Sequence, residues 1–186
     1  KRGVGAPLVL REPQDERVVG VGGWRGSPDV RGSRRYYGGV SPSPRARKGL
    51  GQHWLVEGRY LSRIAGAGDI TDPDTVIEVG PGTGLLTERL AARASRLIAV
   101  EVDPRLIERL REKFAGAPNV TIVEGDALTM SAEEILAAGG GGLPFVVAGN
   151  LPYFIGTAIV RKFLRDALRP RWMVVTLQAE VAENMA

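Results

Sequence analysis

The sequence predicts an α/β protein with a doubly wound parallel sheet, in which helices cover both faces. Five short apolar stretches alternate with amphipathic stretches between residues 75 and 177, which is the pattern of βαβ units. The first apolar stretch runs directly into three glycines at alternate positions, Gly80, Gly82 and Gly84. Polar residues follow the next three apolar stretches. Because parallel strands end at the same edge of a sheet, we expect these residues to share one site.

The composition is that of a soluble globular protein and excludes several kinds of site. The chain has 186 residues, 44% hydrophobic and 25% charged, so one domain plus a tail is expected. Cysteine is absent, which excludes disulfides, thiolate metal sites and cysteine nucleophiles. His53 is the single histidine, so we expect no metal site. No apolar stretch approaches the ~20 residues that span a bilayer, and no signal sequence is evident, so we expect a cytoplasmic protein.

Residues 1–47 form a basic segment, which we expect to be a disordered extension of a domain over residues 48–186. The segment is rich in Gly, Pro, Ser and Arg, and holds ten Lys or Arg against four Asp or Glu. Beyond the short LVL and VVGV runs it shows neither helical nor strand periodicity. Its charge favours a polyanionic partner such as RNA, but solvated disorder or an unstructured leader explains the same charge equally well.

The first part of the domain alternates helix, strand and helix. A helix is predicted over about Val56 to Ala67, because Leu61 and Ile64 recur there at helical spacing. The β-branched stretch Thr75–Val79 predicts a buried strand. The glycines then turn the chain into a helix that runs from Leu85 to about Arg93.

Capping signals and apolar periodicity define the remaining elements. Asp103 and Pro104 are a typical N-cap and first position of a helix, and Ser131 with Glu134 forms a capping box. We expect Thr157 to cap a later helix. The predicted elements, in order, are a strand over 96–102, a helix from 103, a strand over 120–124, a helix from 131, a strand over 145–148, a helix from 157, a strand over 172–177 and a helix from Gln178.

The glycine turn is suited to a close approach between backbone and a nucleoside. Glycine adopts positive φ without strain and has no Cβ to collide with a ligand. Glu101, at the end of the second strand and about 20 residues after Gly80, is placed to accept hydrogen bonds from ribose hydroxyls. The spacing is GxGxG rather than GxGxxG, which favours a nucleoside without phosphates over a dinucleotide. Close packing of a strand against a helix is the alternative explanation for such a turn.

Two further strand ends carry residues that can recognise an adenine. Asp126 is suited to accept a hydrogen bond from an adenine amino group. The Asn150 side chain, with a carbonyl freed by the turn at Pro152, can accept both hydrogens of an exocyclic amine. Tyr153 offers a ring on which an extruded base can stack. A structural turn with a packing tyrosine is the alternative.

Several segments resemble the successive motifs of the ribosomal RNA adenine dimethyltransferases. The segments are KGLGQHWL, EVGPGTGLLT, Glu101, GDAL, GNLPYFIG and LQAEVAENMA, within residues 48–186. This family acts on small-subunit rRNA, and the related erythromycin-resistance methylases act on large-subunit rRNA. GNLPY together with the QxEVA run is the part of the resemblance that points to adenine amino methylation. The implied fold is the Rossmann-like fold of S-adenosylmethionine-dependent methyltransferases.

The resemblance implies S-adenosylmethionine as cofactor and assigns residues to it. The implied cofactor-binding residues are His53, Leu55, Gly80, Gly82, Glu101, Asp126 and Asn150. In this assignment His53 borders the methionine end of the cofactor, at a position where Asn is commoner. Glu101 holds the ribose, and Asp126 holds the adenine.

The resemblance also implies a catalytic segment and a mechanism. The segment is Asn150, Leu151, Pro152 and Tyr153, with Asn150 touching cofactor and target and Tyr153 stacked on the target base. Carbonyl acceptors on the amine hydrogens favour direct in-line methyl transfer, without a strong general base. A site wide enough for a methylated amine permits a second transfer.

Members of the family continue past the position of Ala186, with two further strands and a small helical domain that grips rRNA. We therefore expect this chain to be a fragment that holds the cofactor at best weakly, with strand 172–177 as an unprotected sheet edge. The expected partner of a monomeric enzyme is small-subunit rRNA or a pre-ribosomal particle. Two alternatives remain: a non-catalytic ribosome-assembly or nucleic-acid-binding protein on the same fold, and a nicotinamide-dependent oxidoreductase, which GNLPY disfavours.

Overall fold

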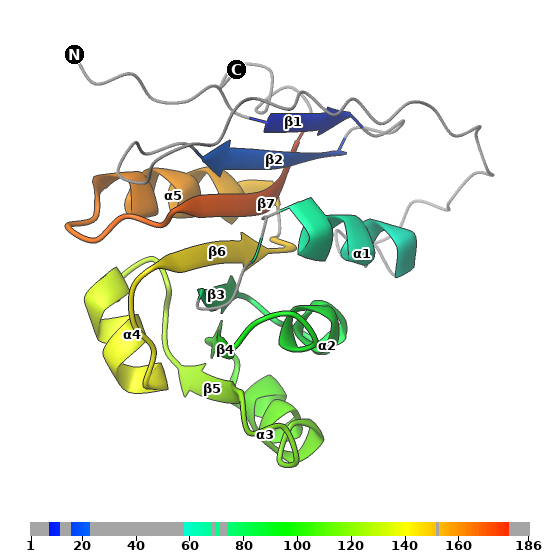
Figure 1. Cartoon of the computed structure of the whole chain (residues 1–186), viewed down its shortest axis with the longest axis vertical. Coiled ribbons are helices and arrows are strands. Elements are labelled where there is room, and N and C mark those ends of the chain that lie inside the picture. Colours follow the sequence, from blue (N-terminus) through cyan, green and yellow to red (C-terminus); the bar gives the residue numbers. More distant parts are fainter. Residues whose placement is uncertain are drawn as a thin grey trace.

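A computed structural model describes residues 8–11, 16–22, 58–67, 70, 74–151 and 153–178 of the chain. These residues build one seven-stranded sheet with the strand order β1-β2-β7-β6-β3-β4-β5 (Figure 1). The strands are β1 (Leu8–Arg11), β2 (Glu16–Gly22), β3 (Thr75–Val79), β4 (Arg96–Glu101), β5 (Val120–Glu124), β6 (Phe145–Gly149) and β7 (Trp172–Gln178). Strands β3 to β7 pair in parallel, which confirms the expected five-stranded parallel sheet.

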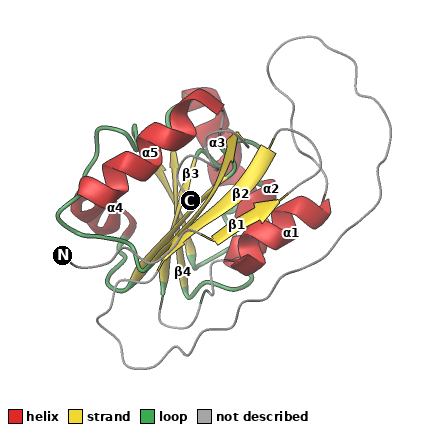
Figure 2. Cartoon of the chain, turned by 90° about the horizontal axis from the view of Figure 1, so that it is seen from above, coloured by secondary structure: helices red, strands yellow, loops and turns green. Residues whose placement is uncertain are grey.

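Helices cover both faces of this sheet. They are α1 (Gly58–Ala67), α2 (Leu85–Ala91), α3 (Pro104–Lys113), α4 (Ala132–Gly139) and α5 (Tyr153–Arg165). α1, α2 and α3 lie on one side of the sheet, and α4 and α5 lie on the other (Figures 1 and 2). Each side has its own apolar core, with Leu61, Leu86 and Leu90 in one and Ile135 and Phe163 in the other. None of the described helices is both long and apolar enough to cross a membrane.

Two predicted helix starts have the expected capping contacts. The Asp103 side chain accepts a hydrogen bond from the Arg105 amide at 3.0 Å, and Pro104 occupies the first helical position. Ser131 and Glu134 exchange both hydrogen bonds of a capping box, at 3.1 and 2.7 Å. Local sequence signals of this kind satisfy amides that the helix leaves unpaired, and so they set where each helix begins.

The start of α5 and the end of β7 differ from the prediction. α5 begins at Tyr153, so Thr157 lies inside the helix and does not cap it. Gly156, which the predicted start at Thr157 places before the helix, lies within α5 at a point where the helix approaches β7 closely. A Cβ at Gly156 would lie 2.5 Å from Leu177 Cδ2 and 3.0 Å from the Thr176 carbonyl oxygen. Gln178 is the last residue of β7 rather than the first residue of a helix.

The strands β1 and β2 correct the expectation that residues 1–47 are disordered throughout. LVLR and ERVVGVG pair as an antiparallel hairpin, and β2 also pairs antiparallel with β7, where Val18 lies opposite Thr176. The expected unprotected edge of β7 is therefore covered. The reason is that the edge of β7 presents unpaired N–H and C=O groups. Even a short run that contains β-branched residues can form a strand by hydrogen bonding to them. The rest of the predicted extension lies outside the described residues.

An ion pair ties the beginnings of β3 and β7 together across the sheet. The guanidinium of Arg171 donates two hydrogen bonds to the carboxylate of Asp74, one of them from Nε to Oδ1 at 3.1 Å. Asp74 is fully buried, so this pairing supplies charge compensation that water cannot. It anchors the amino ends of the strands, at the opposite edge of the sheet from the residues considered next.

Candidate functional site

The candidate site lies where four neighbouring parallel strands end. Gly80 directly follows β3, Glu101 is the last residue of β4, Asp126 comes two residues after β5, and Asn150 directly follows β6. Because β6, β3, β4 and β5 are adjacent and parallel, these residues share one edge of the sheet. The sequence predicted this arrangement.

The glycine turn after β3 adopts a conformation that other residues reach only with strain. Gly80, Gly82 and Gly84 have φ values of 65°, 58° and 78°. The Gly80 amide donates to the Val100 carbonyl at 3.0 Å, which ties the turn to β4. A Cβ at Gly84 would lie 2.9 Å from the ring of Phe114, so close packing against the end of α3 is an additional reason for glycine there. A Cβ at Gly80 would lie 3.7 Å from Leu151 Cδ2, which is an ordinary van der Waals contact.

Glu101 binds the glycine turn directly. Its Oε2 accepts a hydrogen bond from the Gly82 amide at 3.2 Å, and its Oε1 accepts from the amides of Val102 and Asp103 at 2.8 and 3.0 Å. A carboxylate offers about four acceptor positions, so these three bonds leave one on Oε2. The side chain is therefore held rigidly at the end of β4 and keeps the capacity to accept one further hydrogen bond.

Asp126 stands on a short turn beside the end of β4. The Gly125 amide donates to the Glu101 carbonyl at 2.9 Å, which fixes the beginning of this turn. Asp126 Oδ1 accepts from the Leu128 amide at 2.8 Å, an interaction typical of Asx turns. The side chain is exposed, and Oδ2 has no hydrogen-bond partner among the described residues. One carboxylate oxygen thus orients the side chain while the other remains an open acceptor.

Asn150 and Leu151 directly follow β6, and the first is half-buried whereas the second is buried. The half-buried Asn150 side chain makes no hydrogen bond to a described residue. Leu151 is buried, and its main chain is bound on both sides by Thr176 of β7. The Thr176 hydroxyl accepts from the Leu151 amide at 2.8 Å and donates to the Leu151 carbonyl at 3.2 Å. The carbonyl keeps its second lone pair, so it can still accept a hydrogen bond from a ligand.

Part of the predicted site lies outside the described residues. His53, Leu55 and Pro152 belong to the part that the structure does not describe. Tyr153 is described as the first residue of α5, but its side chain is not. The roles expected for these four residues remain predictions.

Three residues of this edge were not identified from the sequence. Thr176 is one, and the apolar residues Val102 and Leu128 are the others. Val102 is 67% exposed and Leu128 is 37% exposed, although both are large apolar side chains. They follow Glu101 and Asp126 by one and two positions. Exposed apolar side chains next to open acceptors can flank a heterocyclic ring whose polar edge the acceptors bind.

Glu78 is a buried acid directly beneath the glycine turn. It is 1% exposed within β3, and neither carboxylate oxygen has a hydrogen-bond partner among the described residues. The pKa of Glu78 is raised from 4.5 to about 8, mainly by burial; the Glu101 carboxylate also raises it, whereas the nearby Thr87 hydroxyl and the Lys113 ammonium lower it. The group is therefore protonated and uncharged at neutral pH. The sequence signal that could have identified Glu78 is an acidic residue within a strand of otherwise mainly apolar residues.

Two hollows border the candidate site, and neither is lined by Glu101, Asp126 or Asn150. One, of about 240 Å³, lies between the glycine turn and α3 and is lined by Gly82, Thr83, Leu106, Arg109, Leu110 and Lys113. Lys113 closes one side of it by donating to the Thr83 carbonyl at 2.9 Å. The other, of about 520 Å³, lies between Leu128 and α5.

Comparison with known proteins gives one consistent family. A family model described as "Ribosomal RNA adenine dimethylase" matches residues 44–186. The chain is 51% identical over 141 residues to "Ribosomal RNA small subunit methyltransferase A" of Dehalococcoides mccartyi, which covers 76% of this chain and 47% of that protein. It is 46% identical over 142 residues to the protein of the same name from Geobacter metallireducens, covering 76% and 51%. The chain thus spans about half the length of these curated relatives.

Solved structures agree with this result. The 23S rRNA methyltransferase ErmE matches with a TM-score of 0.57 and 35% identity, over 66% of this chain and 47% of that one. A dimethyladenosine transferase from Plasmodium falciparum matches with a TM-score of 0.57 and 28% identity, over 68% and 43%. The Rossmann-like methyltransferase fold that the resemblance implied is confirmed.

Proposed function

Because the chain belongs to the ribosomal RNA adenine dimethylase family, we propose that it carries the cofactor- and target-binding domain of an rRNA adenine-N6 methyltransferase. The proposed reaction transfers methyl from S-adenosylmethionine to the exocyclic amine of adenines in small-subunit rRNA. The observation that supports it best is the pair of acceptors after β6. The Asn150 side chain has no partner among the described residues, and the Leu151 carbonyl is positioned by Thr176 with one lone pair free.

The residues at the strand ends fit the proposed cofactor. Gly80 and Gly82 present backbone without side chains, as a nucleoside lying against the turn requires. Glu101 keeps one acceptor position for a ribose hydroxyl, and Asp126 Oδ2 is open for an adenine amino group. Val102 and Leu128 offer apolar surface to the ring. We further propose that His53 and Leu55 border the methionine end.

The chain's own contribution to the reaction is to bind and orient the amine. The sulfonium cofactor supplies an activated methyl group when it is bound. The lone pair of an adenine amine is delocalised into the ring, which makes the nitrogen a weak nucleophile. Two acceptors from Asn150 and Leu151 would bind its hydrogens, favour pyramidal geometry and stabilise the positive charge that develops on nitrogen. Tyr153 would stack on the extruded base.

This function implies a setting for the protein. The proposed partner is small-subunit rRNA, free or within a pre-ribosomal particle, and the proposed location is the cytoplasm. We propose that a single copy of the chain binds this partner. A site that accepts a monomethylated amine would allow two transfers to one adenine.

The test is titration calorimetry with S-adenosylmethionine, followed by transfer of labelled methyl to small-subunit particles that lack adenine dimethylation. We expect cofactor binding by the 186-residue chain, and label in adenines that is lost in Asn150→Ala. A version extended at its C-terminus is assayed in parallel, because the part of the chain that matches the curated relatives spans only about half of their length. Without label from either version, the catalytic proposal is wrong. RNA binding that responds neither to cofactor nor to Asn150→Ala would support a non-catalytic RNA-binding protein instead.

A further inference from the structure

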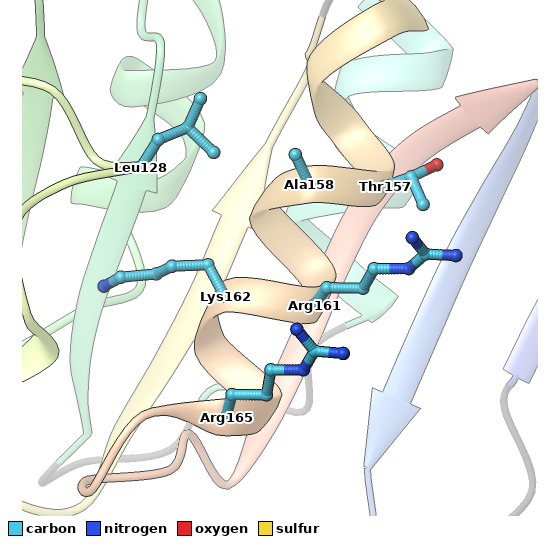
Figure 3. A pocket seen from close by; sticks show the side chains of 6 residues that line it. All are labelled: Leu128, Thr157, Ala158, Arg161, Lys162 and Arg165. Atoms are coloured by element: carbon cyan, nitrogen blue, oxygen red, sulfur yellow. The ribbon is translucent and has the colours of Figure 1, made fainter.

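The larger hollow carries an unusual concentration of positive charge. It is lined by Leu128, Thr157, Ala158, Arg161, Lys162 and Arg165, of which five belong to α5 (Figure 3). In Figure 3 the side chains of Arg161 and Arg165 point to the same side of α5, whereas Lys162 points the opposite way. We call Arg161 and Arg165 the arginine pair.

Lys162 already has a structural role. Its ammonium pairs with Asp166 at 3.0 Å and lies 4.0 Å from the centre of the Phe163 ring. Asp166 in turn accepts from the Ala132 amide at the start of α4, at 2.9 Å. These contacts fasten α5 to α4, so Lys162 is occupied within the fold.

The arginine pair has no such partner. Both side chains are exposed, and neither forms an ion pair or hydrogen bond with a described residue. The sequence of α5, YFIGTAIVRKFLR, contains no acidic residue. Like charges four positions apart repel and destabilise a helix. Among the residues that the structure describes, nothing compensates the charge of the two guanidinium groups, and an anionic ligand would neutralise it.

The arginine pair is also close to the candidate site. α5 begins directly after the Asn150–Leu151 segment, and at about 1.5 Å per residue Arg161 lies about 12 Å along the helix from Tyr153. Leu128 also lines the hollow, on the side of α5 to which Lys162 points (Figure 3), and its amide is bound by Asp126. The hollow thus begins where the proposed adenine site ends.

We propose that the arginine pair binds backbone phosphates of the RNA strand next to the target adenine. The strand would cross the exposed face of α5, so that Ala158 and Leu128 on the other side of the helix lie against a neighbouring sugar or base. Guanidinium groups bind phosphate in a bidentate manner, and a hollow with both cationic and apolar walls matches the two parts of a nucleotide. A membrane fits less well, because the apolar face of α5 is buried in the core. The inference rests on the proposed function only for the identity of the RNA.

The test measures binding of the 186-residue chain to a short fluorescein-labelled RNA hairpin with adjacent adenines in its loop, by fluorescence anisotropy. We expect Arg161→Glu with Arg165→Glu to weaken binding about tenfold or more and to reduce the slope of log affinity against log salt by about two. Arg161→Lys with Arg165→Lys keeps the charge but loses the bidentate geometry, so we expect it to weaken binding clearly less than the Glu variant and to leave the salt slope unchanged, which separates the effect of charge from an effect on folding. The matched control is Arg93→Glu with Arg111→Glu, exposed cations on α3 and the turn after α2, which we expect to change affinity less than about twofold.

Each result decides the proposal. The proposal is wrong if the unaltered chain does not bind RNA. It is also wrong if the control and the α5 variant lose RNA affinity equally, or if neither loses affinity. Binding to phosphatidylserine vesicles that depends on the arginine pair in the absence of RNA binding would overturn it as well. Calorimetry with S-adenosylmethionine on every variant keeps the two proposals separate. A chain that binds RNA through the arginine pair but never methylates it would sink the proposed function and leave this inference standing.

Discussion

The Thr176 hydroxyl binds the Leu151 main chain twice, accepting from its amide at 2.8 Å and donating to its carbonyl at 3.2 Å. Both residues are buried, and they come from different elements, with Thr176 in the middle of β7 and Leu151 in the segment after β6. This contact holds in place a backbone segment that has no strand partner of its own. It therefore couples the central sheet to the proposed target-binding acceptors.

Replacing Thr176 by Val tests that coupling. Valine keeps the shape of threonine but leaves the buried Leu151 amide unpaired, which we expect to cost about 1–3 kcal/mol of stability. In a methylating version of the protein, kcat should fall about tenfold or more while the Kd of S-adenosylmethionine stays within about twofold. Thr176→Ser, which keeps the hydroxyl, is the control and should retain most activity. Equal kcat in Val and Ser variants would exclude a positioning role.

Glu101→Gln tests the role of the carboxylate at the end of β4. An amide group cannot accept all three backbone hydrogen bonds that Glu101 now accepts, and it offers a weaker acceptor to a ribose hydroxyl. We expect affinity for S-adenosylmethionine to fall about tenfold or more, measured by calorimetry. Glu124→Gln is the matched control, because Glu124 lies opposite Glu101 in the sheet register but its side chain is 59% exposed. If both substitutions weaken cofactor binding equally, the loss is caused by the change in net charge and not by the loss of the Glu101 contacts.

The sequence predicted those parts of the structure that local signals control. The caps at Asp103 and Ser131, and the polar residues at the strand ends, follow from short-range patterns and from the geometry of a parallel sheet. Thr176 gave no such signal. A single threonine in WMVVTLQ is ordinary in a strand, and its partner Leu151 lies 25 positions earlier.

Tertiary context also explains the elements that were predicted incorrectly. The predicted start at Thr157 left Gly156 outside the helix, but α5 includes Gly156, and the proximity of β7 requires a residue without a side chain there although glycine is unfavourable in helices. The strands β1 and β2 are short and weakly patterned, and β2 depends on pairing with an edge that only the folded sheet presents. Neither constraint can be found within a short window of sequence.

Glu78 should make the stability of the protein depend on pH. Its pKa rises from 4.5 in the ordinary state to about 8 in the fold because of burial, so the folded protein retains a proton that the unfolded chain releases. The contribution of Glu78 to the free energy of unfolding is therefore fully present below pH ~4.5 and is lost as the pH rises towards about 8. Glu78→Gln, which carries no titrating group, should exceed the unaltered protein in stability by about 3 kcal/mol at pH 7 and match it near pH 4.5. Urea denaturation across this range measures the difference, with Glu124→Gln as an exposed control. Parallel pH profiles for the Glu78 variant and the unaltered protein would show that its carboxyl group titrates normally.

Two glycine substitutions in helices should have opposite effects. Alanine is favoured over glycine within a helix by about 1 kcal/mol, so Gly66→Ala in α1, where an added Cβ meets no heavy atom within 4 Å, should be neutral or stabilising. At Gly156 the same Cβ would lie 2.5 Å from Leu177 Cδ2 and 3.0 Å from the Thr176 carbonyl oxygen. The leucine side chain can move, but the backbone oxygen of β7 cannot without disturbing the strand. We therefore expect Gly156→Ala to destabilise the protein by about 1–3 kcal/mol, as measured by chemical denaturation. A stabilising effect at both positions would mean that α5 does not depend on glycine for its close approach to β7.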